Sequence, residues 1–195
     1  MTTMDTPHTI EFRLLRPHRF HVIDLVVNGT RLLDLVREAE LPYAVEEQRE
    51  SEADFAPDPV PLLAGAYALL RADGRAWPSR HLLGEPTDGA ADGWREDETL
   101  LLTCPCGVDE CWALVAQVEV SDTAVRWSGF RSVRRDWDLT GLGPFTFSRR
   151  QYEASLRATA RAAREARTAR RLSAAAAGRR PPRWPRSPAA RRAAG

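Results

Sequence analysis

The sequence predicts an α+β protein: an antiparallel sheet with helices on one face, a long C-terminal helix and a disordered basic tail. Short apolar runs separated by turn residues fill 99–131, a pattern typical of a β-meander. Helical spacing is confined to separate segments and does not alternate with every strand, which favours α+β over α/β. Beyond residue 148 arginine and alanine dominate.

The N-terminal part is expected to form two strands and a helix. The strands cover residues 9–17 and 19–27, where apolar side chains are frequent and partly alternate. Asn28-Gly29 follows and predicts a tight turn, because both residues tolerate positive φ. Over 31–40 the apolar residues recur at helical spacing, and we expect Pro42 to stop this helix.

The middle of the chain is less regular. Residues 43–60 are acidic and predict a short helix at most, followed by a loop. The apolar run 62–70 fits a helix or a buried strand, and the flanking prolines and Asp-Gly favour the strand. Residues 77–86 indicate one helical turn ended by Gly84, and 87–98 form a second acidic loop.

The C-terminal elements give the clearest pattern. Strands are expected over residues 99–104, 111–120 and 124–131, and residues 141–147 are expected to form a Gly/Pro entry into a last short strand. Ser148 with Gln151 three residues later forms a capping-box pattern, which predicts the start of a long helix. Alanine, arginine, proline and glycine then exclude a packed core from the end of the chain.

Charge divides the chain into regions. We expect a disordered N-terminus at 1–8, an acidic α+β domain at 9–148, a basic helix at 149–172 and a disordered Arg/Ala/Pro tail at 173–195. The first 148 residues hold 14 arginines against 25 acids, a net charge of −11. The remainder holds 14 arginines against two glutamates, a net charge of +12.

Composition also predicts the compartment. No apolar run reaches the roughly 20 residues that a spanning helix needs, so we expect no membrane association. The N-terminal sequence lacks the apolar region of a secretory leader. Three cysteines do not make a disulfide framework, which favours the reducing cytoplasm.

All three cysteines, Cys104, Cys106 and Cys111, lie within one turn between two predicted strands. Residues two apart on a strand share a face, so the first two thiols should lie side by side, with the third returning opposite them. Zinc takes four tetrahedral ligands, usually Cys or His. The local candidates for the fourth ligand are Asp109 and Glu110, and His81 is the nearest histidine in sequence. A zinc site formed by Cys104, Cys106, Cys111 and His81 is therefore one interpretation of this turn.

Two other interpretations of the cysteines stay open. Free cysteines also pack as small apolar side chains, and the spacing here departs from the common zinc knuckle. A reactive thiol is the third alternative, and His81 beside one cysteine would form a thiol–imidazole pair for nucleophilic catalysis. Similarly, Trp112, Trp127 and Trp137 fit either a pocket or the core.

Several motifs together resemble a family of small uncharacterised bacterial proteins. The shared features are a Cys-x-Cys-Gly…Cys turn, a Trp-Ser-x-Phe strand and a Gly-Leu-Gly-Pro-Phe-x-Phe…Gln-Tyr-Glu motif before a C-terminal helix. In this chain they are Cys104, Cys106, Gly107 and Cys111; Trp127, Ser128 and Phe130; and Gly141 to Phe145, Phe147, Gln151, Tyr152 and Glu153. The resemblance covers most of residues 10–156 and implies no particular activity.

The predicted C-terminal helix carries a narrow arginine stripe, which suits contact with nucleic-acid phosphates. The candidate nucleic-acid residues are Arg157, Arg161, Arg164, Arg171, Arg183, Trp184 and Arg186, with Trp184 placed to stack on a base. A solvated extension without function and attraction to the acidic loops are the alternatives.

Taken together, these patterns favour a cytoplasmic, non-enzymatic binding or regulatory module whose Cys turn is structural or holds zinc. A nucleic-acid-associated protein and a thiol-dependent enzyme are the alternatives. An unknown protein partner remains compatible with the sequence.

Overall fold

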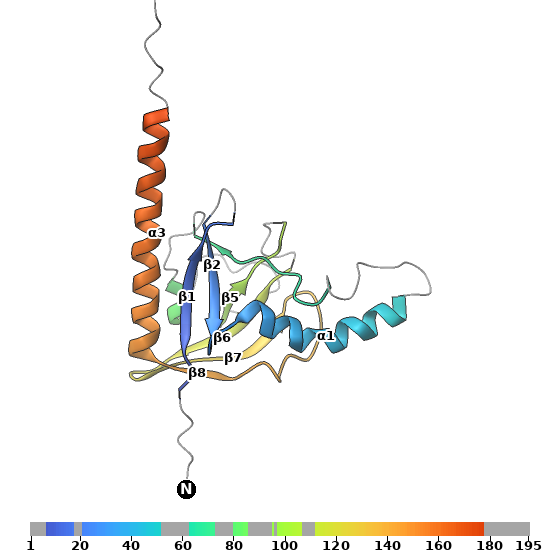
Figure 1. Cartoon of the computed structure of the whole chain (residues 1–195). Coiled ribbons are helices and arrows are strands. Elements are labelled where there is room, and N and C mark those ends of the chain that lie inside the picture. The colour runs from blue at the N-terminus through green and yellow to red at the C-terminus, as the bar shows by residue number, and fades with distance from the viewer. Residues whose placement is uncertain are drawn as a thin grey trace, which may run out of the picture.

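The α+β class is confirmed by a computed structural model, which describes residues 7–17, 21–51, 63–72, 80–85, 95, 97–106 and 112–177. Two antiparallel sheets are accompanied by helices, among them a long C-terminal helix (Figure 1). The elements are β1 (Ile10–Leu15), β2 (Val22–Val27), β3 (Thr30–Arg31), α1 (Leu32–Ser51), β4 (Leu70–Arg71), the 3₁₀ helix η1 (Arg80–Leu83), β5 (Glu98–Leu102), β6 (Leu114–Val120), β7 (Ala124–Ser132), β8 (Phe145–Ser148) and α3 (Arg149–Ala177).

The first sheet is built around β2. Strand β1 pairs with one edge of β2, with Phe12 opposite Leu25, while β3 and β4 pair with β2 on its other side. The expected turn between β2 and β3 is present, with φ of 50° at Asn28 and 83° at Gly29. The Asn28 side chain also accepts a hydrogen bond from the Thr9 amide at 2.8 Å, which ties the turn to the start of β1.

The second sheet is the predicted meander, in the order β5-β6-β7-β8. Each strand pairs antiparallel with the next, and Val118 of β6 lies opposite Trp127 of β7. Isolated bridges connect the two sheets at both ends: His8 pairs with Phe147, and Ala68 pairs with Thr103. The second bridge lies just before the Cys turn and therefore fixes its N-terminal side.

Helix α3 covers the outer edge of β1 (Figure 1). Ser155 accepts a hydrogen bond from the Phe12 amide at 3.1 Å, and Thr159 donates to the Phe12 carbonyl. Gln151 donates to the Ile10 carbonyl at 2.6 Å. An exposed strand edge is a template for pairing with another chain, and these side chains occupy its backbone groups instead.

Tyr152 is the buried point at which α3 meets the second sheet. Its ring is fully buried, and its hydroxyl accepts a hydrogen bond from the Trp127 indole at 3.2 Å. The same hydroxyl donates to the Leu82 carbonyl of η1 at 2.8 Å. Trp127 is itself inaccessible to solvent, so the core interpretation holds for this tryptophan.

Helix α1 does not stop at Pro42, as the sequence suggested, but continues to Ser51. A proline inside a helix frees the carbonyl four residues earlier, here that of Glu38. Glu38 and Pro42 both lie on the exposed side of α1, where water can satisfy this carbonyl, while Glu40 and Ala44 are buried. Burial of Glu40 and Ala44, on either side of Pro42, therefore stabilises the helix more than the proline destabilises it.

The strand favoured for 62–70 is also largely wrong. Apart from the bridge at Ala68, regular pairing begins only at Leu70, and the backbone turns at Gly65, where φ is 67°. A Cβ at Gly65 would approach the Arg37 Cβ to 2.8 Å, so this close approach to α1 requires glycine. Leu62 lies outside the described residues.

The first and last described residues of the chain differ from expectation. His8 belongs to the segment expected to be disordered, yet its amide donates to the Thr146 carbonyl at 2.8 Å. Helix α3 runs to Ala177 rather than to 172, because alanine-rich sequence has high helix propensity. Residues 178–195 lie outside the described residues. None of the helices described is both long enough and apolar enough to cross a membrane.

Substituting Tyr152→Phe should lower the free energy of unfolding by about 1–3 kcal/mol, because the Trp127 indole and the Leu82 carbonyl would stay buried without their partner. Urea unfolding followed by circular dichroism measures this loss. Tyr43→Phe on α1 is the matched control and should change stability by less than about 0.5 kcal/mol. Equal effects of the two substitutions would contradict the role given to the Tyr152 hydroxyl.

Candidate functional site

The Cys turn follows the end of β5 directly. Cys104 and Cys106 flank Pro105, and their Sγ atoms lie 3.0 Å apart. The Cys106 amide is also 3.5 Å from the Cys104 sulfur. Cys104 is buried and Cys106 is exposed. The two thiols are therefore adjacent, although the turn, and not the alternation of a strand, brings them together.

The other two predicted zinc ligands cannot be placed. Cys111 lies outside the described residues; His81 belongs to η1, but its side chain is not among those described. Within the described part of the chain, no group of three or more His, Cys, Asp or Glu side chains is arranged to hold a metal ion. The four-ligand site of Cys104, Cys106, Cys111 and His81 stays a prediction.

Aromatic rings stack around one guanidinium, that of Arg135, and one of these rings belongs to Trp112, the residue after Cys111. The Arg135 Cζ atom lies 4.2 Å from the centroid of the Trp112 ring and 4.3 Å from that of Trp137. Tyr67 packs outside Trp112 and Tyr43 outside Trp137, with ring centroids 6.1 and 6.2 Å apart. We call these five side chains the Arg135 stack.

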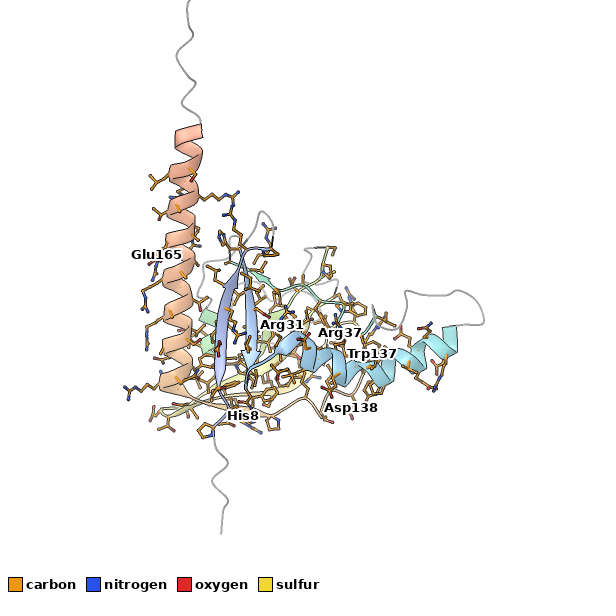
Figure 2. The ribbon with its side chains drawn as sticks, in the orientation of Figure 1. His8, Arg31, Arg37, Trp137, Asp138 and Glu165 are labelled. Atoms are coloured by element: carbon orange, nitrogen blue, oxygen red, sulfur yellow. The ribbon has the colours of Figure 1, made fainter. Side chains whose placement is uncertain are left out.

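The Arg135 stack joins segments that are distant in sequence. Tyr43 belongs to α1, Tyr67 precedes β4, Trp112 precedes β6, and Arg135 and Trp137 lie between β7 and β8. Figure 2 shows Trp137 beside α1. The two tryptophans are only half-buried, so they belong neither to the deep core nor to an open surface.

Arg135 is mostly shielded from water, with 15% of its side chain exposed. Burial lowers the pKa of this guanidinium, while the carboxylates of Glu47 and Glu40 oppose that effect. Its ion pair with Glu47 spans 2.8 Å. Arg135 Nη1 and Trp112 Nε1 are buried without a hydrogen-bond partner among the described residues, so the stack retains unused donors.

Glu40 is fully buried and is hydrogen-bonded to Tyr67, a member of the Arg135 stack. Its carboxylate accepts hydrogen bonds from the Tyr67 hydroxyl at 2.6 Å and the Gly65 amide at 2.7 Å. Burial raises the pKa of Glu40, and these two hydrogen bonds and the Arg135 charge only partly offset it. The pKa of Tyr67 is also raised, first by burial and then by the adjacent Glu40 charge.

The residues predicted to bind nucleic acid divide into three groups. Arg157 forms an ion pair with Glu153 at 3.0 Å. Arg161, Arg164 and Arg171 are exposed on α3 and form no ion pair within the described part of the chain. Three further candidates lie outside the described residues: Arg183, Trp184 and Arg186.

The comparisons with known proteins leave the site to be interpreted from its geometry. No protein-family model matches the chain, and neither the curated proteins nor the solved structures give a match.

Sequence reasoning missed Glu40 and Arg135 as members of one cluster. The sequence shows that Arg135 and Trp137 are two residues apart. It does not show their contacts with α1 and with Trp112, because these join segments up to about a hundred residues apart. A glutamate on the apolar side of a predicted helix is a weak signal that was available, because such a carboxylate needs buried partners.

Glu40→Gln should make stability less sensitive to pH. The raised pKa means that the folded state holds this proton more tightly than the unfolded chain. Ionisation of Glu40 therefore lowers the stability of the native protein as pH rises from the ordinary value of 4.5 through the raised one. The variant lacks this loss, so its stability relative to the native protein should increase as pH rises above the ordinary value of 4.5.

Urea unfolding at several pH values measures this difference. The matched control is Glu46→Gln, which removes an exposed carboxylate of α1. It should shift stability by less than about 0.5 kcal/mol across the range. A Glu40→Gln curve parallel to that of the native protein would contradict the buried, proton-binding state of Glu40.

Proposed function

We propose that this chain is a non-enzymatic binding or regulatory module whose Cys turn holds a thiophilic metal ion, most simply zinc. The observation that carries the proposal is the 3.0 Å approach of the Cys104 and Cys106 sulfurs. Thiolates are preferred zinc ligands, and two that are already adjacent reduce the ordering needed to form a site.

The geometry requires only a small adjustment for zinc. Two sulfurs bound at about 2.3 Å in a tetrahedron lie about 3.8 Å apart, so this pair must separate by about 0.8 Å. The exposed Cys106 offers a route for the ion, while the buried Cys104 provides a ligand shielded from water. Cys111 as a third thiolate and His81 as the fourth ligand complete the proposed coordination.

A regulatory role follows from the position of Trp112, the residue after Cys111. Movement of the Cys turn on metal binding would be transmitted to Trp112, and hence to the Arg135 guanidinium stacked on it at 4.2 Å. Arg135 in turn contacts Glu47 of α1. The metal would thus bias the position of α1 through a contiguous set of packed side chains.

Titration with Co²⁺ as a spectroscopic substitute for zinc tests the site. The native protein should take up one equivalent and develop thiolate-to-cobalt charge-transfer absorption, which added zinc then removes. Cys106→Ser should weaken this absorption and the affinity, because one thiolate is lost. The change lies at an exposed side chain, so circular dichroism should show an intact fold.

His8→Gln is the matched control, since it removes a histidine two residues before β1 and is not a proposed ligand. It should leave the cobalt spectrum unchanged. Less than about a tenth of an equivalent of zinc in protein purified without an affinity tag, together with no cobalt charge-transfer band, would exclude the metal site.

The rate at which the cysteines are labelled distinguishes a thiol-dependent enzyme from a metal-binding module. An activated thiolate would react with iodoacetamide near neutral pH much faster than an ordinary cysteine. In the metal-binding module, labelling of the metal-free protein should be slow, and zinc should protect the cysteines further. Fast labelling that zinc does not affect would favour the enzyme.

A further inference from the structure

We propose that Cys104 and Cys106 form a reversible disulfide when the protein meets a hydroperoxide, and that this oxidation prevents metal binding at the Cys turn. The pair is thus a modification site, in which Cys106 is oxidised first and Cys104 is the resolving thiol. The effect on metal binding rests on the proposed function, whereas the formation of the disulfide does not.

The spacing of the two sulfurs suits bond formation. The structure holds both side chains as thiols, and their Sγ atoms lie 3.0 Å apart. A disulfide bond spans about 2.04 Å, so the sulfurs need to approach by about 1 Å. Zinc coordination needs the opposite movement, a separation by about 0.8 Å. The observed pair lies between the geometries of the two products and can reach either by a small movement.

The backbone holds the two thiols in this arrangement. The Ala68 amide donates to the Thr103 carbonyl at 2.7 Å, and the Thr103 amide donates to the Ala68 carbonyl at 2.9 Å. Cys104 is the next residue and is 7% exposed. Between the two cysteines lies Pro105, whose ring fixes φ and limits the freedom of the connecting backbone. Each sulfur therefore meets the other at a high effective concentration.

The difference in exposure assigns a role to each thiol. Cys106 is exposed, so a dissolved oxidant meets this sulfur first. Cys104 lies buried beside it and is shielded from the same oxidant. The Cys106 amide lies 3.5 Å from the Cys104 sulfur, where an N–H donor stabilises negative charge on an attacking sulfur. Cys104 is therefore the residue that resolves the oxidised Cys106.

The oxidation proceeds in two steps. The Cys106 sulfur attacks one oxygen of the hydroperoxide, the O–O bond breaks, and the other oxygen leaves as water or an alcohol; Cys106 becomes a sulfenic acid. The Cys104 sulfur then attacks the Cys106 sulfur, and the S–O bond breaks with release of water. In total the two thiols lose two electrons and two protons, and the hydroperoxide accepts both.

The disulfide and the proposed metal site exclude each other. Thiolates are the form of cysteine that binds metal, and oxidation removes two of them at once. Bound zinc in turn occupies the sulfurs and should slow their oxidation. Because Cys106 is exposed, small thiols can reach the disulfide and reduce it, which makes the change reversible.

The test uses the full chain, reduced, freed of metal and of reductant, and then treated with hydrogen peroxide. Alkylation in denaturant should then modify one cysteine instead of three, and the monomer should lose about 2 Da as two thiol hydrogens. Peptide mapping should place the bond between Cys104 and Cys106, and dithiothreitol should restore all three thiols. A disulfide to Cys111, or oxidation without any disulfide, would overturn the proposal.

Two variants test the roles of the thiols. Cys111→Ser is the matched control, because it removes a cysteine that is not part of the pair; it should form the disulfide at the native rate. Cys104→Ser/Cys111→Ser also removes the resolving thiol, so the Cys106 sulfenic acid should accumulate and be trapped by dimedone. Failure to trap it in a variant with native circular dichroism would contradict the assigned roles. If this variant unfolds, the peptide mapping of the native protein still decides.

Cobalt titration of the reduced and the oxidised protein tests the effect on metal binding. The oxidised form should bind cobalt at least about 100-fold more weakly, because losing even an outer partner of a metal ligand costs about 10–100-fold. Equal affinities would refute this effect. A Cys104–Cys106 disulfide in a protein whose reduced form binds no cobalt would confirm the modification site and refute the metal site. Cobalt binding without a peroxide-induced disulfide would refute the present inference alone.

Discussion

The organisation of the candidate site depends on the Arg135 guanidinium held between two indole rings. A mostly buried cation is unfavourable unless aromatic faces and carboxylates surround it. Here Trp112 and Trp137 cover its two faces, and Glu47 pairs with it at 2.8 Å. These partners come from separate segments. Their contacts with Arg135 therefore fix the relative positions of α1, the start of β6 and the β7–β8 connection.

The same constraint gives the Cys turn a defined setting. On its N-terminal side, Thr103 pairs with Ala68, and on its C-terminal side Trp112 is held by Arg135. The sulfurs of Cys104 and Cys106 thus lie next to each other on a segment anchored at both ends. Anchoring of this kind restricts the positions that a metal ligand can adopt, and it provides the physical link between the thiols and α1.

How far the sequence predicts this structure depends on whether the determining contacts are local. The meander and the turn at Asn28-Gly29 follow from alternation and backbone preferences, and both are present. The continuation of α1 through Pro42 could not be predicted in the same way, because buried contacts of Glu40 and Ala44 decide it. The turn at Gly65 likewise depends on Glu40, 25 residues earlier. The Arg135 stack is entirely a tertiary feature. The adjacency of Cys104 and Cys106 was expected from strand alternation, but a turn after the end of β5 produces it.

The most direct test of this account is a double-mutant cycle between Trp112 and Arg135, with Trp112→Leu and Arg135→Met measured singly and together by urea unfolding. If the stacked guanidinium and indole stabilise each other, the two losses should differ from additivity by about 0.5–2 kcal/mol. Losses that add to within about 0.3 kcal/mol would show that the two side chains do not interact, and the proposed connection between the Cys turn and α1 would then have no physical basis.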